Sequence, residues 1–149
     1  MLFRSNGLGN ITGLNDTLTA AYQQPLSLQL LFGLLLQYLA FAIGVPWNYA
    51  LHVGSLIGTK VVLNEFVGYL DLSSLIASGK IVSDKAIMMA TFALCGFANL
   101  SSIAIQIGGI TPLAPERRKD LAALGLKAVL GGTLANLMTA TIAGMFFGS

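Results

Sequence analysis

The chain has 149 residues, of which 55% are hydrophobic and only 9% are charged. Soluble domains carry about 25% charged residues, so eight Lys and Arg and six Asp and Glu are too few to coat a compact domain of this length. With a mean hydropathy of +0.78, the composition argues against a water-soluble enzyme and indicates a protein in the lipid bilayer. The net charge of +2 comes from bases at the ends of apolar runs, which argues against a nucleic-acid partner.

The first segment, residues 1–25, is too polar for a secretory signal sequence. Asn15 or Asp16 would cap a short helix over residues 11–24 that Pro25 ends. Its mixture of Leu, Thr and Tyr suits a membrane interface, so we assign residues 1–25 to a cytoplasmic or interfacial segment.

Three uncharged runs follow within residues 26–149, and each predicts a membrane span. Residues 26–45 have the roughly 20 apolar residues that a span needs. Residues 86–115 are uncharged but contain CGFANLSS, whose Asn and Ser compete with the helical backbone, so this span should be interrupted. Residues 128–147 form the third run, with small residues at 131, 132 and 135 that suit close helix packing, and we place the last span at residues 121–148.

Residues 47–70 are apolar, but Gly58-Thr59-Lys60 divides them into halves too short to cross a bilayer alone. A re-entrant helical hairpin fits this pattern best, with its turn at Gly58-Thr59 and with Asn64 and Glu65 on the second arm. The sequence thus predicts an all-α integral membrane fold with three spanning helices, one of them interrupted, and a re-entrant hairpin.

Basic residues gather between the last two spans, at Arg117, Arg118, Lys119 and Lys127. The positive-inside rule places that connection in the cytoplasm and the carboxyl terminus outside. The hairpin then enters from and returns to the outer face.

Glu65 is the most informative residue, because a carboxylate in an apolar run costs about 2.5 to 3.5 kcal/mol and usually faces a cavity or pathway. The structural alternative is that Glu65 pairs with Lys60 or lies at an interface. Asn99, Ser101 and Ser102 form a second group, whose donors and acceptors suit a neutral polyhydroxylated ligand or, alternatively, hydrogen bonds between helices. Phe97 beside them is either a stacking or a packing residue.

Catalytic and metal-binding motifs are missing from the sequence. His52 is the only histidine, no HExxH or GxSxG is present, and no nucleotide-binding glycine motif occurs. We therefore expect no enzyme activity, no metal site and no cofactor. A broken span, a hairpin, a buried acid and an Asn/Ser cluster are instead typical of one half of a secondary transporter.

Three segments carry a more specific resemblance: GTKVVLNEFV at residues 58–67, GFANLSSI at residues 96–103 and APERR at residues 114–118. In this order they resemble the carboxyl-terminal portion of the concentrative nucleoside transporter family, and the resemblance extends from about Ile11 to the end. The family implies a trimeric, elevator-type symporter of the plasma membrane, in bacteria a multi-pass protein of the inner membrane, that takes up nucleosides with sodium or protons.

The resemblance also implies roles for single residues. Glu65, Asn99 and Ser102 match residues that contact the ribose in the family, and Phe97 matches a wall of the same pocket. The first hairpin, which recognises the nucleobase, and the sodium site have no counterpart in this chain. The substrate's ribose side would therefore be bound here, while the coupling cation would bind mainly outside this chain.

Two hypotheses remain open. The chain is either the carboxyl-terminal part of a nucleoside:cation symporter, active with an amino-terminal half as its partner, or a non-transporting membrane remnant or accessory protein. An upstream reading frame that encodes a first hairpin would favour the symporter.

Overall fold

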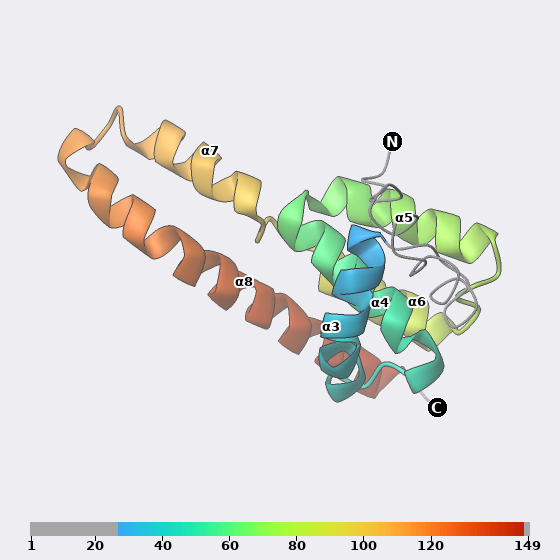
Figure 1. Cartoon of the computed structure of the whole chain (residues 1–149). Helices are drawn as coiled ribbons and strands as arrows, with labels where there is room; N and C mark the ends of the chain where they lie inside the picture. The colour runs from blue at the N-terminus through green and yellow to red at the C-terminus, as the bar shows by residue number, and fades with distance from the viewer. Residues whose placement is uncertain (1–26, 148–149) are drawn as a thin grey trace.

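The computed structural model describes residues 27–147, which fold as helices without a strand in that range (Figure 1). The elements in chain order are α3 (Leu28–Ala42), α4 (Trp47–Val62), α5 (Glu65–Ala77), α6 (Asp84–Leu94), α7 (Leu100–Ile110), the 3-10 turn η1 (Pro115–Arg117) and α8 (Arg118–Phe146). The helix expected over residues 11–24 lies outside the described residues.

The helices α3 and α4 fold back on one another, with a bend of 118° between them. Gly44 provides the turn at a φ of 106°, a conformation that side chains other than glycine rarely adopt, and Pro46 precedes the first residue of α4. Helix α3 is 15 residues long, about 22 Å. The predicted span at residues 26–45 is therefore a shorter helix that packs along α4.

The turn expected at Gly58-Thr59 is wrong, because α4 runs unbroken through both residues. A β-carbon at residue 58 would overlap the Phe32 side chain, so this glycine lets α3 approach α4 closely. The chain breaks five residues later, at Leu63 and Asn64. Asn64 adopts extended backbone angles, and its Oδ1 accepts the Val67 N–H at 3.0 Å, which begins α5 at Glu65.

The interruption expected within residues 86–115 is confirmed, since α6 ends at Leu94 and α7 begins at Leu100. Helix α8 then returns beside α7 (Figure 1). Its second half packs against α6, with Gly144 beside Met89. Of the small residues expected to pack, Gly132 faces Ala98, whereas Gly131 and Ala135 are exposed. The core lies among α3, α4, α5, α6 and the end of α8.

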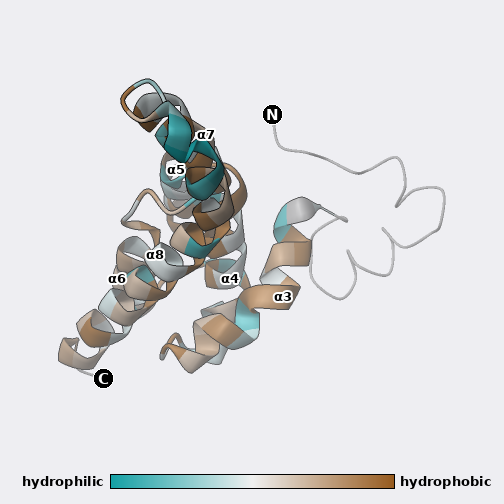
Figure 2. Cartoon of the chain, turned by 90° about the vertical axis from the view of Figure 1, so that its left-hand side faces the viewer, coloured by the Kyte–Doolittle hydropathy of each residue, from teal (hydrophilic) through white to brown (hydrophobic). Residues whose placement is uncertain are grey.

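Helix α8 is the one helix of the described range that is long and apolar enough to cross a membrane, and the bent pair α3–α4 passes the same test when taken together. Only 11% of the most apolar stretch of α8 is buried inside the chain. In Figure 2 hydrophobic colour covers most of the helices, and the hydrophilic colour gathers where α7 is followed by α8. The exposed apolar surface fits a chain that lies in lipid or against further protein.

Candidate functional site

The break between α4 and α5 meets the break between α6 and α7, and this meeting point brings Glu65 and Asn99 together. Asn99 Nδ2 donates a hydrogen bond to Glu65 Oε2 at 3.2 Å across 34 residues of sequence. Each of the two residues lies at the amino terminus of a helix: Glu65 is the first residue of α5, and Asn99 caps α7. The positive end of the α5 dipole favours the carboxylate there.

Asn99 is 3% exposed, and its side chain is held by its own helix. Its Oδ1 accepts the Ser102 N–H at 2.8 Å, while Ser102 Oγ accepts the Asn99 N–H at 3.2 Å, which completes a capping box. Because Oδ1 is committed to the helix, Nδ2 is the amide atom that faces Glu65. The capping box therefore fixes the direction of the bond to the carboxylate.

Ser102 Oγ also lies 2.6 Å from the carbonyl oxygens of Phe97 and Asn99, to either of which it donates its proton. Its hydroxyl thus holds the shape of the unwound stretch. A role as a ribose contact, as the resemblance implies, stays a prediction for Ser102.

Side chains near each break bond backbone carbonyls near the other break. Two of these carbonyls, those of Ala93 and Leu63, have no helical partner, whereas the Thr91 carbonyl also accepts the Cys95 N–H. Lys60 Nζ donates to the Ala93 carbonyl at 3.0 Å, Tyr69 Oη to the Thr91 carbonyl at 3.0 Å, and Ser101 Oγ to the Leu63 carbonyl at 3.3 Å. Unpaired carbonyls of broken helices are costly where water is absent. Reciprocal bonding therefore explains how two broken helices are tolerated side by side.

Glu65 does not pair with Lys60, so the structural alternative raised by the sequence is wrong in that respect. The ammonium bonds the Ala93 carbonyl, and the one ion pair within residues 27–147 joins Arg117 to Asp120 at the surface. The Glu65 carboxylate keeps Oε1 and further lone pairs for other donors. A carboxylate with an amide beside it suits two neighbouring hydroxyl groups of one ligand.

Gly96 shapes the unwound stretch between α6 and α7, with a φ of 154°. A β-carbon at this position would lie 2.6 Å from Asn136 Nδ2 on α8. Asn136 therefore lies against the break, although it is not among the site residues predicted from the sequence. A lone amide in the middle of the last apolar run was the signal that would have found it.

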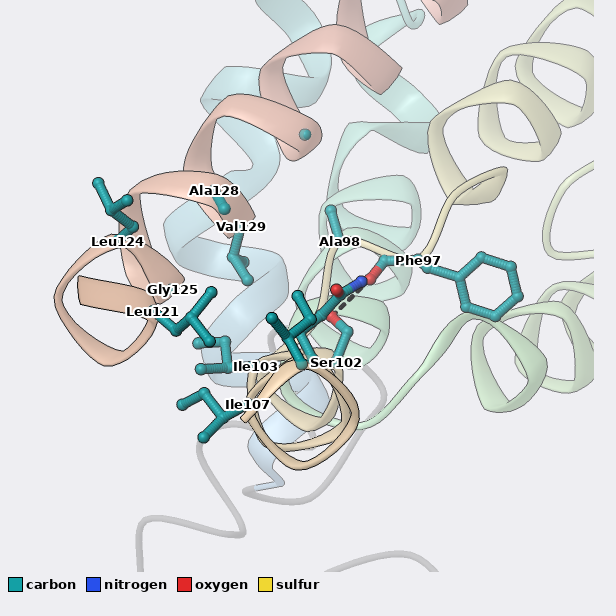
Figure 3. A pocket seen from close by; sticks show the side chains of 13 residues that line it. Phe97, Ala98, Ser102, Ile103, Ile107, Leu121, Leu124, Gly125, Ala128 and Val129 are labelled. Atoms are coloured by element: carbon teal, nitrogen blue, oxygen red, sulfur yellow. Dashed lines mark hydrogen bonds between the residues drawn. The ribbon is translucent and has the colours of Figure 1, made fainter. Parts of the chain in front are cut away.

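Phe97 is 79% exposed, and its ring points away from the groove between α7 and α8 (Figure 3). This groove has a volume of about 430 Å³ and an apolar lining that includes Ile103, Ile107 and Leu124. The ring is thus free to contact a ligand or another part of the protein. No group of three His, Cys, Asp or Glu side chains is placed to hold a metal ion within residues 27–147.

The chain is similar to known transporters over nearly its whole length. The family model described as Na+ dependent nucleoside transporter C-terminus matches residues 7–144. An uncharacterized transporter, YutK, of Bacillus subtilis is 56% identical over 120 residues, which cover 80% of this chain and 29% of that protein. The nucleoside permease NupC of Helicobacter pylori is 52% identical over 127 residues, with 84% and 30% covered.

A solved structure, CNTnw in an inward-facing substrate-bound state, aligns with a TM-score of 0.79 and 46% identity, covering 95% of this chain and 34% of that chain. The present chain thus spans about 30% of the length of these bacterial relatives.

Proposed function

The chain belongs to the Na+ dependent nucleoside transporter family, as its carboxyl-terminal portion, and from this premise we propose that it supplies part of a nucleoside:cation symporter. The complete transporter would take up nucleosides together with sodium or protons. This chain would bind the ribose, and the amino-terminal portion that the relatives possess would bind the nucleobase and most of the coupling cation.

The observation that carries the proposal is the Glu65–Asn99 pair at the meeting of two helix breaks. Secondary transporters bind substrates at such interruptions near the middle of the membrane. The free lone pairs of Glu65 would accept hydrogen bonds from ribose hydroxyls, and the second N–H of Asn99 would donate to a ribose oxygen. Phe97 would form a wall beside the bound sugar, and Ser102 would contact it at the end of the capping box.

The arrangement in the membrane follows from the same proposal. Residues 27–147 would lie in the bacterial inner membrane as part of a multi-pass protein, with the basic connection before α8 in the cytoplasm. The helix breaks and α8 would belong to a domain that moves against a trimeric scaffold, in the elevator manner that the family resemblance implies. The long apolar helix α8 supports the membrane location.

A chimeric transporter tests the proposal. The matching 127-residue stretch of NupC from Helicobacter pylori is replaced by this chain, and uridine uptake is measured in cells that lack their own nucleoside transporters. We expect uptake by the chimera and a loss of at least about tenfold for Glu65→Gln, because a hydrogen bond to a charged group contributes about 1.5 to 3 kcal/mol.

The matched control is Glu116→Gln, which removes an exposed carboxylate in η1, far from the breaks in the fold. We expect this variant to take up uridine at the native rate. Native uptake by Glu65→Gln would contradict the role of Glu65. A folded, membrane-inserted chimera without any uptake would favour the remnant or accessory protein instead.

A further inference from the structure

Lys60 is the largest fully buried side chain of the described part of the chain, with 0% of its surface exposed. Among residues 27–147 its ammonium has one hydrogen-bond acceptor, the Ala93 carbonyl at 3.0 Å. Burying a charge is costly unless the surroundings compensate it. The position of Lys60 therefore calls for a source of negative potential other than a paired carboxylate.

The Glu65 carboxylate acts on the ammonium from beyond ion-pair distance, and two helix ends add negative potential at the ammonium itself. Lys60 lies in the last turn of α4, and its partner Ala93 is the penultimate residue of α6. The helical partner of the Ala93 carbonyl would be the N–H of Phe97, which lies in the unwound stretch. Each helix carries about half a negative charge at its carboxyl terminus, so the two ends together match one ammonium.

Carboxyl ends of half-helices and unwound carbonyls are also the groups that coordinate sodium in secondary transporters. We propose that Lys60 is a resident cation at this position: its ammonium takes the place of a bound metal ion at the carboxyl ends of α4 and α6. The ammonium joins the two breaks, and the coupling cation binds elsewhere in the transporter.

The consequence for the site is geometric. Lys60 precedes Glu65 by five residues, and Ala93 precedes Asn99 by six, so the Lys60–Ala93 bond lies just before both members of the pair. Lys60 is thus a positioning residue that sets the spacing between Glu65 and Asn99. This functional consequence rests on the proposed nucleoside transport, whereas the resident charge does not.

The charge is tested on the purified chain in detergent, without any nucleoside. Lys60→Ala removes the atoms that n-propylammonium would replace, and 1-propanol is the neutral molecule of matching size. We expect n-propylammonium to raise the melting temperature of this variant by at least about 3 °C and 1-propanol to leave it unchanged. Equal effects of the two molecules, or none, would overturn the proposal. The native chain and Lys80→Ala, which removes an exposed lysine, serve as controls.

The positioning role is tested in the chimeric transporter with Lys60→Met, which keeps the apolar stem and folds without a buried charge. We expect the KM for uridine to rise about tenfold while the maximal rate changes little. A native KM would overturn the positioning role. Should the native chimera show no uptake, the proposed transport fails, and the amine experiment still decides whether Lys60 is a resident cation.

Discussion

Asn99→Asp replaces the side-chain NH₂ group of Asn99, at the centre of the site, by a carboxylate oxygen. Aspartate caps a helix as well as asparagine does, so the bond to the Ser102 N–H is retained. The Nδ2 donor, 3.2 Å from Glu65 Oε2, is replaced by a carboxylate oxygen. The variant therefore separates the contact between the two breaks from the capping of α7.

The size of the effect follows from two contributions. The lost hydrogen bond to a charged group contributes about 1.5 to 3 kcal/mol, equivalent to about 10- to 150-fold in an equilibrium constant. Two carboxylates about 4 Å apart would in addition repel by about 4 kcal/mol at an effective dielectric constant near 20. We expect at least a tenfold loss of uridine affinity at about pH 8.

Acid should partly restore the affinity of this variant, because a proton shared by two carboxylates removes the repulsion and provides a donor again. The assay is uridine uptake by the chimeric transporter, compared between about pH 8 and about pH 5 and normalised to the native chimera at each pH. Ser83→Asp, a substitution at the N-cap of α6, is the control and should behave as native. Native affinity of Asn99→Asp at alkaline pH, or no gain on acidification, would refute the reasoning.

Two further predictions concern the unwound stretch. Gly96→Ala should destabilise the chain by about 1 to 3 kcal/mol. A φ of 154° is strained for any residue with a side chain, and the new β-carbon would collide with Asn136. The control is Gly108→Ala, whose β-carbon meets open space and which should leave the melting temperature unchanged or raise it. Cys95 is the single cysteine, is exposed, and adjoins the break. In the chimeric transporter, saturating uridine should therefore slow the alkylation of Cys95 at least about tenfold. An unchanged alkylation rate in a chimera that binds uridine would place the substrate elsewhere.

The helix breaks show which parts of the fold can be predicted from the sequence. Asn and Ser in the middle of an apolar run indicate an interruption, and the structure has it at residues 95–99. Gly58-Thr59 has the composition of a turn, but tertiary packing against Phe32 decides its conformation. The turn forms instead at Asn64, where a side-chain cap is available.

The sequence predicts which residues belong to the site, but not the hydrogen bonds that join them. Glu65 and Asn99 are singled out by their polarity in apolar surroundings. Their hydrogen bond spans 34 residues, so no local pattern contains it. The partner of Lys60 is a backbone carbonyl, which every residue possesses, so the sequence pattern offers only Glu65 as a partner, and only as the alternative to a functional role for Glu65.

Uridine binding by calorimetry tests the central claim most directly. The 149-residue chain is purified alone and together with the co-expressed amino-terminal portion of NupC, in sodium-containing buffer, in native and Glu65→Gln forms. The proposed ribose site predicts binding by the native complex, none by the chain alone, and a loss of at least about tenfold in affinity for Glu65→Gln. Undiminished binding by the Glu65→Gln complex would contradict it.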